Sequence, residues 1–132
     1  MNSESLNTYI SETTSTIQKI TGIDLIYFLD INFQIIKEHK LKEVTNCIQE
    51  IKNIVKSAME LKETNTPLYK KPFHTMTLLN ENGLFIIVKL GDTEGLYLVI
   101  IAGESEPVDL IGLLKICKEL RVKYTNTLME SL

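Results

Sequence analysis

The clearest pattern along this 132-residue chain is a helical repeat of apolar positions between residues 41 and 61. Apolar residues recur there every three or four positions, and polar residues occupy the opposite side. The apolar positions are Leu41, Val44, Cys47, Ile48, Ile51, Ile54, Val55, Ala58 and Leu61. At about 100° per residue they span an arc of about 160°, whereas packing onto one layer takes a stripe of about 100°. The excess width predicts that this helix contacts a second surface.

Helices are also predicted near both ends of the chain. Residues 3–21 have apolar positions at near-helical spacing, with Ser3 or Ser5 as the cap. A last helix is predicted after Gly103, with Ser105 as its cap, and it runs to about Leu128. Between the central helix and the next apolar segment, residues 62–72 form a polar stretch with Pro67 and Pro72, which is predicted to be a linker that ends the helix.

Five short apolar segments are predicted to be strands, namely residues 24–30, 33–38, 73–79, 84–90 and 96–102. Segments 84–90 and 96–102 are apolar at odd and even positions alike, so both faces of the sheet must be covered. Segments 33–38 and 73–79 are mixed, which is typical of sheet edges. The order α-β-β-α-β-β-β-α therefore predicts an α/β (α+β) three-layer domain over residues 1–132. Its five-stranded antiparallel sheet has helices on both faces.

Two segments resemble the roadblock (dynein light chain) family, which has a profilin-like sheet. In the first, residues 26–36, an apolar strand ends in Asp30, the two-residue turn Ile31-Asn32 follows, and a second apolar strand begins. The second segment runs from Leu90-Gly91-Asp92 to Ile100 and continues with Ile111-Gly112-Leu113-Leu114 in the last helix. The resemblance covers about residues 3 to 128. The family's hairpin turn usually carries a glycine, and this chain has Phe33 there.

The resemblance implies that two subunits pair through the central helix and the neighbouring edge strand, which makes one continuous sheet. The same resemblance implies a non-enzymatic adaptor or regulator of a small Ras-like GTPase. A homodimer, or a heterodimer with a related roadblock protein, agrees with the wide apolar face of the central helix. The residues expected at the interface are Val44, Ile48, Ile51, Val55 and Met76.

Charge and composition narrow the possible partners. The net charge is −3 without a basic stripe, so nucleic acid is not an expected partner. Lys62, Lys70 and Lys71 are either solvated lysines or a docking patch for an acidic partner.

The longest apolar runs are far shorter than the ~20 residues that span a bilayer, and the first residues lack the pattern of a secretory signal. A cytoplasmic protein without membrane insertion is expected. Cys47 and Cys117 are then interpreted as buried free thiols, with a disulfide or a reactive thiol as the alternatives.

The common catalytic, metal and cofactor motifs are absent from the sequence. It has no phosphate-binding loop, no His-Glu-x-x-His, no Cys-x-x-Cys and no Gly-x-Ser-x-Gly. His39 and His74 are isolated and are interpreted as ordinary side chains, with a metal or acid–base role as the alternative. Asp24 and Asp30 share one strand face but lie ~20 Å apart. Neither cofactor nor catalysis is therefore expected. Two other functions stay open: a small-molecule sensor of the PAS or GAF type, which needs a cavity with polar groups, and an enzyme, which needs a histidine in a cleft beside a carboxylate.

Overall fold

The computed structural model describes residues 2–41, 48–69, 74–81, 83–91, 95–104 and 106–130, without the side chains of residues 48, 61–69 and 80. The predicted order of elements is confirmed. The elements are α1 (Ser3–Gln18), β1 (Ile23–Leu29), β2 (Ile35–Lys40), α2 (Ile48–Tyr69), β3 (Thr75–Asn80), β4 (Gly83–Lys89), β5 (Tyr97–Ala102) and α3 (Leu110–Glu130).

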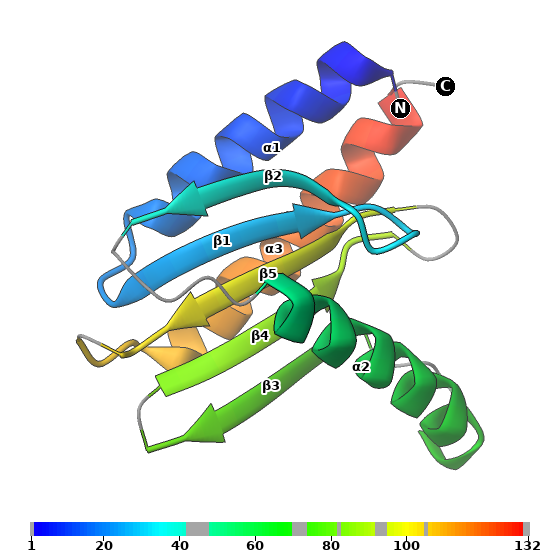
Figure 1. The fold of residues 1–132 in the computed structure, drawn as a ribbon. Helices are drawn as coiled ribbons and strands as arrows, with labels where there is room; N and C mark the ends of the chain where they lie inside the picture. Colours follow the sequence, from blue (N-terminus) through cyan, green and yellow to red (C-terminus); the bar gives the residue numbers. More distant parts are fainter. Residues whose placement is uncertain are drawn as a thin grey trace.

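The five strands form one antiparallel sheet in the order β2-β1-β5-β4-β3 (Figure 1). The strands β1, β5 and β4 are internal, and they are the strands that carry apolar residues on both faces. The strands β2 and β3 are the edges, as their mixed sequences predicted. The two edge strands lie at opposite sides of the sheet.

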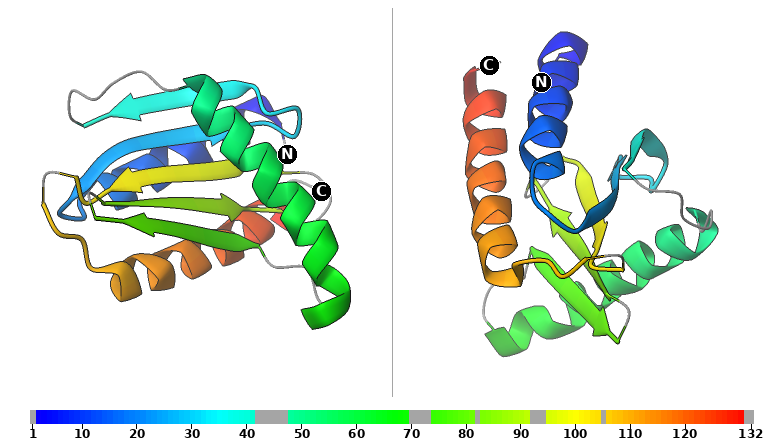
Figure 2. Two further views of the ribbon diagram at one scale, coloured as in Figure 1. Left: turned by 60° about the horizontal axis from the view of Figure 1, so that its bottom comes forward. Right: turned by 90° about the vertical axis from the view of Figure 1, so that its left-hand side faces the viewer.

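Helices cover both faces of the sheet, which confirms the three layers. One face is covered by α1 and α3, which lie side by side, and α2 crosses the other face (Figures 1 and 2). All seven residues of β1 are buried. Ile26 and Phe28 belong to the core on the α1/α3 side, while Leu25 and Tyr27 belong to the core under α2. The alternation of side chains along a strand thus supplies two separate cores.

The helices α1 and α3 are joined by buried contacts of one tyrosine. The hydroxyl of Tyr9 donates a hydrogen bond of 2.8 Å to the carbonyl oxygen of Leu120. The ring of Tyr9 also meets the ring of Tyr124 edge to face, with 5.2 Å between centroids. Because both contacts reach across the whole chain in sequence, they tie the N-terminal helix to the last one.

Both predicted caps differ from those in the structure. At α1 the cap is Asn2, whose side-chain oxygen accepts a hydrogen bond of 2.8 Å from the backbone N–H of Ser5. At α3 the carboxylate of Asp109 accepts a hydrogen bond of 3.1 Å from the backbone N–H of Gly112. Asparagine and aspartate serve as caps because their short side chains reach the free N–H groups of the first turn. Ser105 lies outside the described residues.

The central helix continues further along the chain than predicted, and residues 42–47 of the predicted helix lie outside the described residues. Leu41 is not part of it, because its backbone N–H donates to the carbonyl of Asp24 and its side chain packs on the α1/α3 side. At the other end α2 continues to Tyr69, so the prediction of a linker from residue 62 was wrong for residues 62–69. Pro67 forfeits one backbone hydrogen bond near the end of the helix, and the preceding turns keep theirs.

The turn between β1 and β2 is longer than the predicted two-residue connection. The N–H of Asp30 donates to the carbonyl of Gln34 at 2.9 Å, and the N–H of Phe33 donates to the carbonyl of Asp30 at 3.0 Å. The carboxylate of Asp30 also accepts hydrogen bonds from the N–H groups of Asn32 and Gln34. Phe33 has φ 63°, and no other non-glycine residue in the described ranges has a positive φ. A left-handed conformation favours glycine, the residue that the resemblance to the roadblock family led us to expect at this position.

The substitutions Phe33→Gly and Phe33→Ala form a matched pair that tests this strain. Both remove the ring that stacks on Tyr97 at 5.4 Å and lies 5.8 Å from the Lys56 Nζ. Only alanine keeps the left-handed penalty of about 1–2 kcal/mol. We therefore expect the glycine variant to have a free energy of unfolding about 1 kcal/mol higher than the alanine variant, as measured in urea. At ordinary positions the order is the reverse, so an alanine variant that equals or exceeds the glycine variant would contradict a strained turn.

Candidate interaction surface

The strand β3 is an edge whose outer side is open within the described part of the chain. Its residues pair with β4 from Thr75 opposite Val88 to Asn80 opposite Gly83. No described strand lies beyond it. The outward backbone N–H and C=O groups of such an edge are a template for another strand.

The side chains of β3 do not protect this edge. Its sequence, Thr-Met-Thr-Leu-Leu-Asn, has no charged residue and no proline, the usual devices against unwanted pairing. Met76 and Leu78 face α2, because they stand opposite Ile87 and Phe85 of the core on that side. Leu78 is 43% exposed, and Leu79, which points to the other face, is 67% exposed. Apolar surface is therefore present on both sides of the open strand.

An apolar groove runs between β3 and α2. Its volume is about 370 Å³. The groove is lined by Asn53, Ile54, Ser57, Ala58, Met76 and Leu78. A second hollow of about 310 Å³ shares Ile54 and Leu78 with it and reaches along the edge to Leu79 and Phe85. Beyond the groove, the C-terminal end of α2 extends past the sheet near the start of β3 (Figures 1 and 2).

The predicted interface residues lie in different places. Ile51 and Val55 are 1% and 0% exposed and pack on the chain's own sheet. Met76 is half-buried in the groove. Val44 and the side chain of Ile48 lie outside the described residues. A contact between two chains through these five residues stays a prediction, but Ile51 and Val55 already have core partners within one chain.

The excess width of the helix face has a specific location. The apolar residues of α2 whose burial is described, from Ile51 to Met59, are all buried or half-buried. Ile54 and Met59 are the half-buried ones, and Ile54 lines the groove beside the edge strand. Ile54 and Leu78 were not among the interface residues predicted from the sequence. The only available signal was that Ile54 lies beside the main apolar stripe. Of the three lysines, Lys70 and Lys71 lie outside the described residues, as does the side chain of Lys62.

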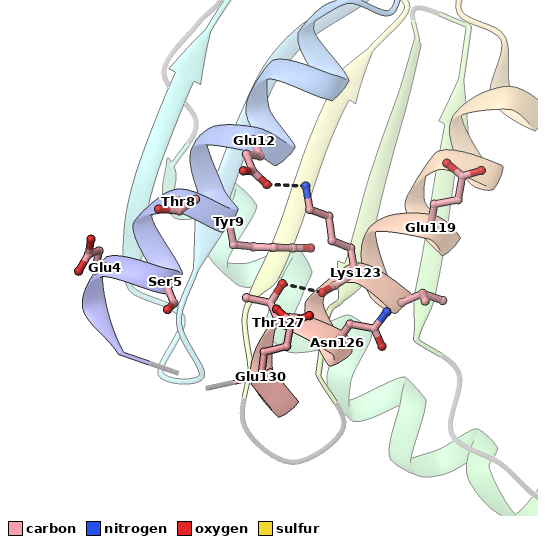
Figure 3. A pocket seen from close by; sticks show the side chains of 11 residues that line it. Glu4, Ser5, Thr8, Tyr9, Glu12, Glu119, Lys123, Asn126, Thr127 and Glu130 are labelled. Carbon is pink, nitrogen blue, oxygen red and sulfur yellow. Dashed lines mark hydrogen bonds and ion pairs between the residues drawn. The ribbon is translucent and has the colours of Figure 1, made fainter. Parts of the chain in front are cut away.

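A polar cleft of about 650 Å³ separates α1 and α3 on the opposite face of the molecule (Figure 3). Four carboxylates line it, those of Glu4, Glu12, Glu119 and Glu130. The Lys123 Nζ donates to the carboxylate of Glu12 across the cleft at 2.5 Å. Both members of this pair are about half exposed, so water screens the interaction and its contribution to stability is small.

The other candidate residues are not assembled into one site. His39 stands opposite Ile26 in the β1–β2 ladder, whereas His74 bonds to the Thr75 hydroxyl beside β3, at the other edge. Asp24 is buried, and its carboxylate accepts a hydrogen bond of 3.2 Å from the N–H of Glu104. Asp30 organises the β1–β2 turn. Among the residues described, no three potential metal ligands lie close enough together to hold an ion.

Cys117 is a buried free thiol, as the sequence predicted. Burial raises the pKa of this thiol to about 11. The thiolate is the reactive form, so the thiol is unreactive at neutral pH. Cys47 lies outside the described residues. No helix in the described ranges is both long and apolar enough to cross a membrane.

Comparison with solved structures identifies the same fold in other proteins. The structure resembles an MglB described as having a tetrameric arrangement, with a TM-score of 0.75 and 12% identity over 100% of this chain and 96% of that one. For the gliding protein MglB from Thermus thermophilus the TM-score is 0.74, with 11% identity and coverages of 98% and 95%. For a Roadblock/LC7 domain from Streptomyces avermitilis it is 0.67, with 14% identity and coverages of 88% and 93%. No family model matches the sequence, and no curated protein matches it.

Proposed function

Because the chain has the roadblock/LC7 fold, we propose that it is a non-enzymatic interaction module that pairs along β3 and α2. The partner is a second copy of the chain or a related roadblock protein. Two β3 strands lying side by side would join two sheets into one. The observation that carries this proposal is the uncharged open edge of β3, flanked by the groove of Ile54 and Leu78.

Strand addition at this edge suits the chemistry of the surface. Main-chain hydrogen bonds supply affinity that does not depend on side chains, and apolar side chains beside the strand supply specificity. An apolar side chain of the partner would fill the groove and cover Leu78, which is 43% exposed in the single chain. Each such buried side chain contributes roughly 1.5–3 kcal/mol.

The paired module serves, in this proposal, as an adaptor or regulator of a small Ras-like GTPase. The support is the resemblance of the sequence to the roadblock family, together with the roadblock fold. The chain supplies binding surface, and any change in GTP hydrolysis arises from the GTPase's own residues. A cytoplasmic location and independence of cofactors belong to the same proposal.

Light scattering of the purified protein tests the pairing. We expect a mass of at least two chains at micromolar concentration, and a stable monomer would overturn the proposal.

Capture of the tagged protein from its own cells tests the GTPase link. We expect a Ras-like GTPase among the retained proteins, retained less by a variant with aspartate at Leu78. Capture without any GTPase would refute the regulatory part and leave the pairing in place.

A ligand sensor of the PAS or GAF type is the competing function. It requires an internal cavity, whereas the hollows described above lie between elements at the surface. Thermal unfolding in the presence of nucleotides, haem or lipids separates the two functions. We expect no rise in the melting temperature with any of them, and a rise of several degrees with one of them would favour the sensor.

A further inference from the structure

The hydrogen bonds on either side of β4 show which way the backbone groups of β3 point. The N–H of Lys89 donates to the carbonyl of His74 at 2.7 Å, one position beyond the first pair of the β3–β4 ladder. In the direction of β5, the N–H of Leu90 donates to the carbonyl of Leu96 at 2.9 Å. Hydrogen-bonded and non-hydrogen-bonded pairs alternate along an antiparallel ladder. The odd-numbered residues of β4 therefore bond to β3, and its even-numbered residues bond to β5.

The register of the ladder then identifies the outward backbone groups of β3. Met76 and Leu78 stand opposite the odd-numbered residues Ile87 and Phe85, so their N–H and C=O groups point toward β4. The residues between and beside them direct the same groups away from β4, where no described strand lies (Figure 1). These outward residues are Thr75, Thr77 and Leu79. They form an evenly spaced row of donors and acceptors with Thr77 at its centre.

We propose that the partner on this edge is a second copy of the chain, with the two β3 strands antiparallel and Thr77 opposite Thr77. This inference rests on the pairing along β3 proposed above and adds its register. A two-fold axis at Thr77 makes the contact self-complementary. Because Thr75 and Leu79 lie two positions before and after Thr77, each faces the other across the axis. Every outward residue of each copy then has a partner, and each such pair exchanges two N–H···O bonds.

The neighbouring registers use the open edge less fully. An outward residue must face another outward residue, so the nearest alternatives place Met76 or Leu78 on the axis. With Met76 on the axis, Leu79 would face position 73, which precedes the first residue of β3. With Leu78 on the axis, Thr75 would face position 81, which follows the last residue of β3. The register centred on Thr77 keeps every outward group opposite a residue of the other strand.

The same register brings apolar side chains together on the α2 side of the sheet. Met76 of one copy stands opposite Leu78 of the other, in a pair without backbone hydrogen bonds, where side chains approach most closely. Leu78 is 43% exposed in the single chain, and both residues line the groove beside Ile54. The leucine of each copy therefore covers the groove of the other. Because β3 has no charged residue, no like charges of the two strands meet across the axis.

Disulfide cross-linking in glutathione buffer measures the register. Cys47→Ser is the background, and the remaining Cys117 is buried. Thr77→Cys should become mostly linked pairs on non-reducing gels, because the opposed Cα atoms lie about 5.5 Å apart, within disulfide range. Met76→Cys alone and Leu78→Cys alone should stay unlinked, since each lies about 8 Å from its own counterpart. An equal mixture of these two variants is the matched control. It should cross-link, because positions 76 and 78 are opposite each other at about 4.5 Å.

Light scattering of the reduced variants separates this inference from the proposed pairing. Paired chains that cross-link through Met76→Cys alone or Leu78→Cys alone, and not through Thr77→Cys, would overturn the register and leave the pairing in place. Equal cross-linking of all three variants would indicate chance collisions and would also overturn the register. Paired chains that none of the cysteines links would place the contact away from β3. That result, like a monomeric mass, would overturn both the register and the pairing along β3.

Proline substitutions test the direction of the backbone groups. Proline has no N–H, and an edge strand tolerates it where the N–H faces solvent. Thr77→Pro should stay folded while pairing weakens by about tenfold or more in sedimentation equilibrium, since each copy loses a hydrogen-bond donor at the axis. Met76→Pro is the matched control, and its melting temperature should fall by many degrees because its N–H faces β4. A Thr77→Pro variant that melts as low as Met76→Pro, or pairs as tightly as the wild type, would overturn the proposal.

Discussion

The variant Leu78→Asp is expected to be a folded monomer. Leu78 is 43% exposed in the single chain, so a carboxylate there reaches water and the free energy of unfolding changes little. In a pair joined along β3 the same carboxylate would be buried beside the groove of Ile54 and Met76. Pairing should weaken by on the order of a hundredfold, about 3 kcal/mol.

Light scattering measures the mass of this variant, and circular dichroism shows whether it is folded. Ile31→Asp introduces the same charge at an exposed apolar residue far from β3, and it should leave the paired mass unchanged. A paired Leu78→Asp variant would place the contact elsewhere. Loss of pairing in both variants would point to net charge as the cause and would remove support for the β3 edge.

The second large effect is expected at Val55, where aspartate should unfold the protein. Val55 is 0% exposed and packs with the core between α2 and the sheet. An aspartate there would be buried without a partner, which costs several kcal/mol. The whole stability of a domain of this size is about 5–15 kcal/mol. Thermal unfolding followed by circular dichroism should therefore show a transition lowered by many degrees, or no transition.

Gln49→Asp is the control for this experiment, because Gln49 is exposed near the start of the same helix and does not line the groove beside β3. Its unfolding temperature should differ little from that of the wild type. The comparison also tests the interface predicted from the sequence. A Val55→Asp variant that keeps the wild-type melting temperature and has half the mass would show that Val55 lies at the interface between chains, as the sequence predicted.

The sequence predicts the strand edges and the layers of this protein, because successive side chains of a strand face opposite sides of the sheet. The polarity of alternate residues therefore indicates which faces are buried. The strands β1, β4 and β5 are apolar on both faces, and the structure places all three inside the sheet. The mixed segments that became β2 and β3 are the edges. Even the unusual turn left a signal, since the sequence has Phe33 where glycine is usual, and its φ is 63°.

The local end points of helices were less predictable because several residues could fulfil each role. Asn2 and Asp109 act as caps, although nearby serines offer the same hydrogen-bonding chemistry. The choice depends on which backbone N–H groups tertiary packing leaves free. At the end of α2 the predicted boundary was too early, because Pro67 was expected to lie in a linker and α2 runs through it. A local rule against proline in helices was outweighed there by the rest of the helix.

The chain's sequence by itself determined that the central helix has a wide apolar face, because helical periodicity is local. Only the tertiary structure decided how that face is divided. Where α2 crosses the sheet, Val55 is buried against the core, while its neighbour Ile54 reaches the groove at β3. A rotation of about 100° separates the two residues. Which of them meets the chain's own sheet depends on where the helix lies relative to the sheet's edge, and that position is set by contacts between distant segments.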